Sequence, residues 1–398
     1  MELEFGHGFI PRIGRDNYKA VDRCIGPADL FTELTLDLPW AIVDGAWAED
    51  KPELLDTLKA NGTNLVVDTS GWRYRYEVTG DINKLVHASW APDGPVSLTD
   101  KRKCRELVLD SLRAQAALGA GAYLLSGWMP EESNEDLRSA YELICQVAAE
   151  DIDLPARPYV LFLGGHTKGI EQAMALIDEI PHFVSAIYLQ LSPINPTKDG
   201  PSKLEAIVDV YLYAASKGFK VIAGHAGALT PALRGLGIDG ADAGLATNEA
   251  FDRASARRKA NPRPNSTSQG GGAKPRMYLG QLGRSFSDAD IRQLLSVPAA
   301  AAELLSCRLP CHRFRSGNFL DRAREHSLWE RVHEAELVSA LPPSMRLTRV
   351  YETFRLQRSS LTTINGALAQ EGLDPLDLKP IDNRLTWISR AEASRTAA

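Results

Sequence analysis

The sequence predicts an α/β fold in which eight parallel strands form a closed (β/α)8 barrel, joined to a smaller helical part. The first observation is a rhythm, because short apolar runs alternate with helical stretches of about 10 to 15 residues at intervals of about 30 to 40 residues. The second is that seven or eight such units fill about 280 residues, which favours a closed barrel over an open doubly wound sheet. The third is that several apolar runs end in a carboxylate or a glycine, as strands do at the open face of α/β enzymes.

The elements follow in a regular order after a leading segment at 1–39, in which Gly26-Pro27 marks a turn. Each predicted strand is a run of apolar residues bounded by turn residues. The strands lie at 40–44, 64–68, 122–126, 158–163, 186–191, 220–223 and 237–242. The predicted helices have apolar residues at three- and four-residue spacing, and lie at 52–60, 102–118, 135–149, 170–180, 204–217 and 229–236.

The chain is expected to divide into three regions. Residues 1–300 form the barrel, including a mobile loop at 259–273 that is rich in Gly, Ser, Asn and Pro and cannot bury a core. The loop is expected to interrupt the barrel, since 274–279 has the pattern of one more barrel strand. Residues 301–345 form a cysteine-containing knuckle and a long helix at 318–341, and 346–398 form a C-terminal helical segment at 351–369 and an acidic tail.

Composition places the chain among ordinary soluble globular proteins, with 44% hydrophobic and 24% charged residues over 398 positions. No stretch approaches the roughly 20 consecutive apolar residues of a membrane-spanning helix. The first residues also lack the basic and apolar regions of a secretory signal. We therefore expect a cytoplasmic protein that makes no contact with a membrane.

Five cysteines are too few and too scattered for a disulfide framework, but Cys307 and Cys311 stand close together. His312 follows at once, and His326 and His333 share one face of the predicted helix. Two thiolates and one or two imidazoles complete a tetrahedral zinc site. We expect a structural Zn²⁺ on Cys307, Cys311, His333 and His312, with His326 as a competitor for the fourth position. This zinc-binding helical subdomain would be inserted in the barrel or appended to it. The alternative is a pair of reduced, buried thiols.

The net charge of −6 conceals an asymmetry along the chain. Residues 252–358 contain 19 Lys or Arg against 10 Asp or Glu, so this segment carries +9 and the remainder −15. A basic region of this kind can hold the phosphate backbone of a nucleic acid. The arginines that we expect to bind phosphates are Arg253, Arg257, Arg258, Arg313 and Arg315. The alternative is a solvated helical face that is rich in arginine.

Asp242 is the first candidate for catalysis. The stretch 221–242 predicts a strand, a glycine-rich loop, a short helix and a second strand that ends at Asp242. A carboxylate at the end of a parallel strand lies where α/β enzymes have their active sites. The alternative is that Asp242 caps a helix or a turn. Asp68 ends an earlier predicted strand in the same way, before a tight turn at Ser70-Gly71.

The order of these motifs resembles that of the tRNA-guanine transglycosylase superfamily. Residues 67–72, Val-Asp-Thr-Ser-Gly-Trp, resemble the family's D-S-G-G-F motif, and 237–244, Gly-Ile-Asp-Gly-Ala-Asp-Ala-Gly, resemble its G-V-D-x-F-D-C-V motif. The preceding 227–233 resembles the helix that leads into the second motif. Residues 253–258 stand where the family has P-T-R-x-A-R-x-G, and 307–333 where it has C-x-C-x-x-C and a distant histidine.

The resemblance implies a zinc-containing (β/α)8 enzyme that replaces guanine in a nucleic acid with a 7-deazaguanine. It implies that Asp242 attacks C1′ and forms a covalent glycosyl-enzyme, and that Asp68 holds the base and moves its proton. The implied partners are DNA or tRNA and a free 7-deazaguanine base. A homodimer and association with partner proteins of a modification system are both compatible with it.

The sequence departs from the family at the residues that read the base. Leu163 stands where the family has an amide, and Ser126-Gly127 lacks the family's second pocket carboxylate. These departures favour the branch that modifies DNA over the branch that modifies tRNA. We expect a differently patterned substrate pocket, formed by Ser70, Gly71, Gly164, Gly165, His166, Tyr188, Gln190 and His225.

Two other classes of function stay open. One is a non-catalytic partner subunit that binds nucleic acid, although such a subunit would not need both Asp68 and Asp242. The other is an unrelated hydrolase of a small molecule, in which Asp44, His225 and these two carboxylates hold a metal at the mouth of the barrel.

Overall fold

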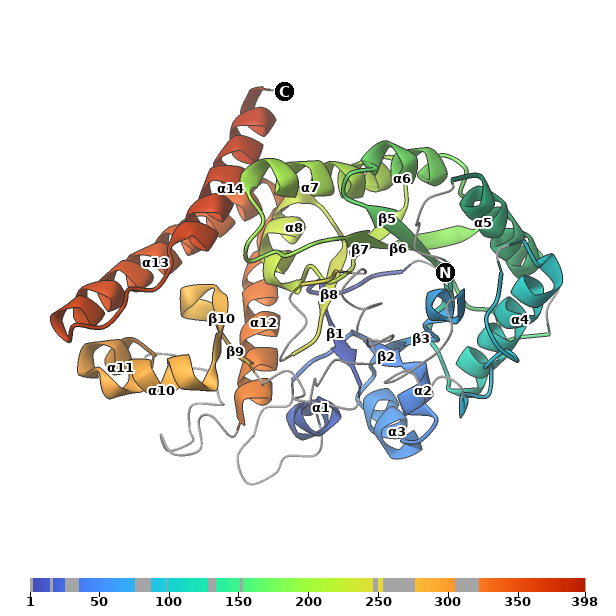
Figure 1. The fold of residues 1–398 in the computed structure, drawn as a ribbon, viewed down its shortest axis with the longest axis horizontal. Coiled ribbons are helices and arrows are strands. Elements are labelled where there is room, and N and C mark those ends of the chain that lie inside the picture. The colour runs from blue at the N-terminus through green and yellow to red at the C-terminus, as the bar shows by residue number, and fades with distance from the viewer. Residues whose placement is uncertain are drawn as a thin grey trace, which may run out of the picture.

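A computed structural model describes residues 3–14, 17–25, 36–75, 87–97, 99–127, 134–150, 153–245, 250–252, 276–304 and 322–397. In this part of the chain, parallel strands form a central barrel, helices surround it, and a group of long C-terminal helices lies to one side (Figure 1).

Eight parallel strands form one sheet that curls into a nearly closed barrel (Figure 1). They are β1 (Phe9–Ile13), β2 (Trp40–Asp44), β3 (Asn64–Asp68), β4 (Tyr123–Leu125), β5 (Tyr159–His166), β6 (Val184–Ser192), β7 (Lys220–Ala223) and β8 (Gly240–Ala243). Their order is β3-β2-β1-β8-β7-β6-β5-β4, and a parallel bridge between Val66 of β3 and Ala122, next to β4, joins the two ends of the sheet. The predicted α/β barrel is confirmed.

The barrel contains one strand that sequence analysis missed. β1 lies in the segment that was expected only to lead into the barrel, and it pairs with β2 on one side and β8 on the other. Pro11, which has no N–H, and the charged Arg12 make this five-residue run look unlike a buried strand. With β1 in place, the eight strands of the sheet are complete at β8.

The expectation that 274–279 adds a barrel strand is wrong. β9 (Arg276–Leu279) pairs instead with β10 (Arg284–Ser287) in an antiparallel hairpin that is separate from the barrel sheet. The pattern of a short apolar run cannot show which strand will become its partner, so the sequence could not separate the two cases. All eight barrel strands therefore precede the stretch 259–273, which lies outside the described residues.

Helices connect successive strands and cover the outside of the barrel (Figure 1). They are α1 (Tyr18–Ile25), α2 (Gly45–Ala48), α3 (Pro52–Ala60), α4 (Lys101–Ala117), α5 (Asn134–Ala149), α6 (Ile170–Ile177), α7 (Pro201–Ser216) and α8 (Thr230–Leu236). In α7, Pro201 stands at the helix start, where no N–H donor is needed. Leu204, Ile207 and Tyr211 are buried at three- and four-residue spacing, which gives the helix one apolar face.

After the β9–β10 hairpin the described chain is mostly helical. The helices are α10 (Asp288–Ser296), α11 (Pro298–Leu304), α12 (Ala323–Ser339), α13 (Pro343–Gln370) and α14 (Lys379–Ala397). α12 and α13 confirm that helices form within 318–341 and at 351–369, although α13 begins earlier than predicted, at Pro343. α14 is a helix where an acidic tail was expected. α13 packs against α8 and α14, and α14 packs against α7, so these helices are attached to the barrel. No helix in the described stretches is both long and apolar enough to cross a membrane.

Candidate active site

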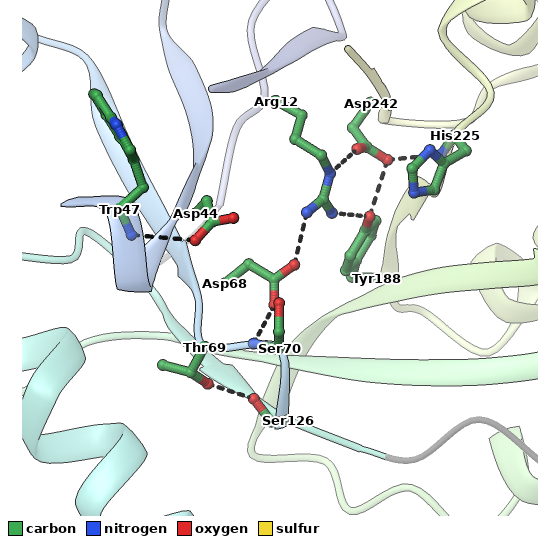
Figure 2. Close-up of polar contacts among 10 residues, drawn as sticks. All are labelled: Arg12, Asp44, Trp47, Asp68, Thr69, Ser70, Ser126, Tyr188, His225 and Asp242. Atoms are coloured by element: carbon green, nitrogen blue, oxygen red, sulfur yellow. Dashed lines mark hydrogen bonds and ion pairs between the residues drawn. The ribbon is translucent and has the colours of Figure 1, made fainter. Parts of the chain in front are cut away.

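Four side chains from four different strands meet inside the C-terminal end of the barrel (Figure 2). Arg12 comes from β1, Asp68 from β3, Tyr188 from β6 and Asp242 from β8. The Arg12 guanidinium donates from Nε to Asp242 Oδ2 at 2.9 Å and from Nη1 to Asp68 Oδ2 at 2.6 Å. It also donates from Nη2 to the Tyr188 hydroxyl. One planar cation therefore holds both predicted catalytic carboxylates in fixed positions.

Asp242 is completely buried and its carboxylate is oriented by three donors. Oδ1 accepts hydrogen bonds from the Tyr188 hydroxyl at 3.1 Å and from the backbone N–H of His225 at 2.8 Å. Burial raises the pKa of Tyr188, so its hydroxyl stays protonated and can donate. Oδ2 accepts the bond from Arg12 Nε. Because a carboxylate oxygen has two lone pairs, Oδ2 keeps the capacity to bond one further atom.

Asp68 is tied to the loop that follows its strand. Its Oδ1 accepts a hydrogen bond from the backbone N–H of Ser70 at 2.7 Å. Ser70 has a φ of 52°, a conformation that residues with a side chain rarely adopt, and this turn brings the N–H to the carboxylate. Burial alone would raise the pKa of Asp68, but the charge and the hydrogen bond of Arg12 outweigh burial and lower it. Asp68 is therefore a poor proton donor.

A buried polar cluster fixes the end of β3. Thr69 Oγ1 lies 2.7 Å from Ser111 Oγ and 2.7 Å from Ser126 Oγ. Trp90 Nε1 donates a hydrogen bond to the carbonyl oxygen of Thr69 at 3.1 Å. A Cβ on Gly71 would lie 2.7 Å from Ser126 Cβ, so this position accepts only glycine without a local shift. The loop predicted to close over the strand end is therefore packed rigidly against the next strand.

Asp44 stands beside Asp68 at the end of the neighbouring strand. The two residues are partners in the parallel β2–β3 ladder, so both side chains point into the barrel. Asp44 Oδ1 accepts a hydrogen bond from Trp47 N at 3.3 Å, which caps α2. Burial raises the pKa of Asp44 against the opposing charge of Arg73. The pKa values of the two adjacent carboxyls are therefore shifted in opposite directions, so Asp44 keeps its proton to higher pH than Asp68 does.

His225 forms the wall of the site next to Asp242. Its φ of 54° turns the backbone so that the N–H reaches the carboxylate. Its ring stacks on Phe251, with ring centroids 4.8 Å apart and planes inclined by 16°. Gly224, the residue before His225, lets the backbone lie close to β6, since a Cβ there would lie 3.1 Å from the side chain of Gln190. The structure thus places His225 and Gln190, both predicted for the pocket, in the same wall.

The other predicted pocket residues lie on β5 and make different contacts. Gly164 N donates a hydrogen bond to the Tyr141 hydroxyl at 3.1 Å. A Cβ at Gly165 would lie 2.5 Å from Leu191 Cδ2, so a side chain here would require Leu191 to shift. His166 is exposed, and its Nδ1 accepts a backbone N–H from the following loop at 3.0 Å. Within the described residues, no hydrogen bond joins these three to the two carboxylates.

Arg12 is the residue of the site that sequence analysis missed. It stands in a run of five residues, Phe9–Ile13, that is otherwise apolar and is followed by Gly14. A lone cation near the end of such a run is the signal that could have identified it. Asn17 holds this strand end, since its Nδ2 donates to the Arg12 carbonyl oxygen at 2.7 Å and its Oδ1 accepts from Gly14 N at 2.8 Å.

Most of the predicted zinc and nucleic-acid ligands lie outside the described residues. They are Cys307, Cys311 and His312, together with Arg253, Arg257, Arg258, Arg313 and Arg315. His333 is described, and it is exposed on α12. Across the stretches that the structure describes, no three His, Cys, Asp or Glu side chains are grouped so that they could hold a metal ion.

We predict that the purified protein carries one Zn²⁺ per chain. Cys311→Ser removes a thiolate ligand and should remove most of the zinc, because a tetrahedral structural site depends on all of its ligands. Cys145→Ser, at a buried thiol on α5, is the matched control and should leave the zinc content unchanged. Elemental analysis of dialysed protein measures both. Zinc at the wild-type level in Cys311→Ser would remove Cys311 from the site.

Comparisons with known proteins leave the family open. No family model matches this sequence, and no curated protein matches it. Among solved structures, the chain is similar to an HpcH/HpaI aldolase from Desulfitobacterium hafniense DCB-2. The sequence identity is 14%, the TM-score is 0.33, and the match covers 60% of this chain and 86% of that chain. A similarity at this level does not bear on function.

The position of the carboxylate group is informative by itself. Active sites of (β/α)8 enzymes lie at the C-terminal ends of the barrel strands. At that end this barrel places Arg12, Asp44, Asp68, Tyr188 and Asp242. Together they can supply a nucleophile, a proton donor and a fixed positive charge, and they form the candidate active site.

Proposed function

We propose that this protein is a base-exchange transglycosylase that replaces guanine in a nucleic acid with a 7-deazaguanine derivative. The observation that carries the proposal is the pair of carboxylates, Asp242 and Asp68, held by one guanidinium at the ends of β8 and β3. Enzymes that transfer glycosyl groups through a covalent intermediate commonly use a pair of carboxyl residues, one of which is the nucleophile. The resemblance of 67–72 and 237–244 to the tRNA-guanine transglycosylases supports the choice of base.

In the first half of the reaction, Asp242 displaces the base. The nucleotide must first leave the stack of the nucleic acid, because its glycosidic bond is inaccessible inside a helix. Asp242 Oδ2 then bonds to C1′, the bond between C1′ and N9 breaks, and its electron pair leaves with guanine. Oδ2 fits this role because Oδ1 already accepts two hydrogen bonds. The carboxylate has no exposed surface, so a neighbouring side chain must move when the nucleotide enters.

The departing guanine also needs a proton, and Asp44 is the better donor. The family resemblance gives proton transfer to Asp68, but Arg12 lowers the pKa of that carboxyl while burial raises the pKa of Asp44. A pair of carboxyls whose pKa values are pushed apart divides into an acid and an anion. We therefore assign binding of the base to Asp68 and proton transfer to Asp44, its partner on the adjacent strand.

In the second half, the incoming base reverses these steps. The 7-deazaguanine loses its N9 proton to Asp44, N9 bonds to C1′, and the bond between C1′ and Asp242 breaks, which restores the carboxylate. No water, metal or energy source enters the balance of this exchange. Arg12 and Tyr188 take part by holding Asp242 through its cycle from anion to ester and back.

The main rival, a hydrolase with a metal on Asp44, Asp68, His225 and Asp242, fits the contacts less well. The Arg12 guanidinium lies between Asp68 and Asp242 and already supplies the positive charge that a metal would bring. His225 contacts Asp242 through its backbone N–H, which cannot bind a metal. The charge arrangement therefore favours a reaction that uses the two carboxylates without a metal between them.

Asp44→Asn is expected to slow the release of guanine about 100-fold at pH 6, the usual scale for loss of a general acid. For wild type, release should slow as pH rises through the pKa of Asp44, because only the protonated carboxyl donates. The variant should lack this decline. Asparagine can still accept the Trp47 N–H, so the fold should persist. Single-turnover release of labelled guanine between pH 5 and pH 8 measures both effects.

Asp56→Asn, an exposed change on α3, is the matched control and should behave as wild type. A wild-type rate and pH profile in Asp44→Asn would return the proton transfer to Asp68.

The proposed function is tested by exchange of radiolabelled guanine into nucleic acid. Purified zinc-loaded protein is incubated with the labelled base and either tRNA or duplex DNA, and the label retained in polymer is counted. We expect incorporation, with DNA preferred to tRNA, and we expect a 7-deazaguanine chase to remove the label. Failure to label either polymer would overturn the proposal.

A further inference from the structure

A cavity of about 550 Å³ lies at the same end of the barrel as the candidate active site. Asn195 and Lys198, from the loop after β6, and Ala250, from the segment after β8, form one side of it. The β9–β10 hairpin and the start of α14 form the other side. This volume is in the range of pockets for small organic ligands, so the cavity is larger than a single inorganic ion needs.

The cavity lining has an excess of positive charge. Lys198, Arg276, Arg284 and Lys379 line it together with one carboxylate, Asp377. The Asp377 side chain accepts the backbone N–H of Lys379, the first residue of α14, at 2.9 Å. Cations that share a cavity repel one another unless an anion joins them. The lining is therefore suited to a ligand with more than one negative charge.

The two arginines are held by carbonyl oxygens rather than by carboxylates. Arg276 Nη2 donates to the carbonyl oxygen of Ser285 at 2.8 Å, and Arg284 Nη1 donates to that of Asp377 at 2.8 Å. The Arg284 guanidinium also lies 4.9 Å from the ring centre of Phe286. Among the described residues, no carboxylate forms an ion pair with either guanidinium. Burial and the neighbouring positive charges of Arg276 and Arg384 lower the pKa of Arg284, despite the opposing charge of Asp377.

The hairpin that carries these arginines is fixed to the C-terminal helices. The buried Arg384 of α14 donates from Nη1 to the carbonyl oxygen of Gly283 at 2.6 Å. Gln357 of α13 donates from Nε2 to that of Gly280 at 2.7 Å. Because Gly280 and Gly283 lie in the turn between β9 and β10, the two arginines are presented on a rigid support.

A direct chain of contacts joins the cavity to Asp242. Ile194 and Phe251 exchange two backbone hydrogen bonds, each of 2.8 Å, and their neighbours Asn195 and Ala250 line the cavity. Phe251 stacks on His225, whose backbone N–H binds Asp242. The cationic cavity and Asp242 are therefore linked through Phe251 and His225.

We infer that this cavity binds phosphate groups of the nucleic-acid strand on one side of the nucleotide whose base is exchanged. The inference rests on the proposed function, and it adds a docking site for the backbone in the C-terminal part of the chain. Contacts to phosphates fix the register of a nucleic acid on a protein without reading its sequence. A clamp at this end of the barrel would hold the strand while one nucleotide turns into the barrel.

The test is binding of a fluorescein-labelled duplex oligonucleotide, measured by anisotropy at several salt concentrations. Lys198→Gln with Lys379→Gln removes two exposed cations and should not disturb folding. Affinity should fall about 10-fold or more, and the slope of log Kd against log salt should become shallower by about 1 to 2. Lys101→Gln with Lys103→Gln on α4 is the control of equal charge and should bind as wild type. Arg284→Gln, checked for folding by circular dichroism, should weaken binding in the same direction.

The outcomes separate this inference from the proposed function. Wild-type affinity and salt slope in Lys198→Gln with Lys379→Gln would overturn the inference, even if wild-type protein exchanges bases. Weaker oligonucleotide binding would support it, even if no exchange is found. Inorganic pyrophosphate is the second probe, because it has the same phosphate chemistry without a strand. If the lysine pair affects pyrophosphate binding and leaves oligonucleotide binding unchanged, the cavity serves a small phosphate ligand and the inference is wrong.

Discussion

Asp242→Asn is expected to lower the rate of base exchange by roughly 10⁴-fold or more, the scale on which the loss of a nucleophile acts. An amide oxygen at Oδ1 can still accept from the Tyr188 hydroxyl and from His225 N. The amide nitrogen then replaces Oδ2 and faces Arg12 Nε, so two donors meet. We expect a loss of stability of about 1 to 3 kcal/mol from this buried mismatch, which leaves the protein folded. Initial rates of label incorporation and thermal unfolding measure the two effects separately.

The matched control is Asp239→Asn, which makes the same change just before the other end of β8. Asp239 accepts a hydrogen bond from Val221 N at 3.0 Å and pairs with Lys220, away from the candidate site. It should lose some stability and keep the exchange rate. Near wild-type exchange by folded Asp242→Asn would show that Asp242 is structural.

Arg12→Lys is expected to lower the exchange rate about 100-fold or more. A lysine offers one compact charge and cannot contact Asp242, Asp68 and Tyr188 at once from a rigid plane. A nucleophile displaced by about 1 Å can lose about 100-fold in rate. Arg113→Lys, at an exposed ion pair on α4, is the control and should exchange as wild type.

Arg12→Gln adds a test through pH. In wild type, Arg12 holds the pKa of Asp68 low, so this carboxylate stays ionised well into the acid range. Without the cation, burial and the neighbouring Asp242 raise that pKa, because two close carboxylates repel. The acid limb of the rate profile should therefore move to higher pH. An unmoved limb in Arg12→Gln would mean that Arg12 does not control the charge of the pair.

Much of the barrel could be predicted because its pattern is local. Buried strands and amphipathic helices each produce a periodic pattern in the sequence. The strands predicted to end at Asp68 and Asp242 indicated which residues would lie at the open end, where β3 and β8 end at Asp68 and Ala243. The meeting of Asp68 and Asp242 follows from the topology of a barrel, since all of its parallel strands end on the same side.

The rest depends on tertiary context. Phe9–Ile13 is a strand only because β2 and β8 pair with it on both sides, which overrides Pro11 and Arg12. The pattern of β9 is that of any short strand, and only its pairing with β10 excludes it from the barrel. Tyr188 was predicted for the pocket, but its hydrogen bond to Asp242 joins β6 to β8. The spacing of the two residues in the sequence does not indicate this contact.

The division of roles that we propose between Asp44 and Asp68 could not be predicted from the sequence either. Both residues end apolar strands and look equivalent in the sequence. Their pKa values separate because Arg12 donates a hydrogen bond to Asp68, which lowers its pKa, whereas burial is the largest influence on the pKa of Asp44 and raises it. A difference of this kind arises from the folded environment and becomes visible only when the structure is known.

The covalent intermediate is the central claim, and trapping it is the most direct test. Wild-type protein is mixed with an oligonucleotide labelled in its backbone, without an incoming base, and resolved on a denaturing gel. We predict a slow-migrating band that disappears when a 7-deazaguanine base is added. The labelled peptide obtained from this band should contain Asp242. The band should be absent for Asp242→Asn and present for Asp239→Asn. A band that persists in Asp242→Asn, or a label on a peptide without Asp242, would contradict the account.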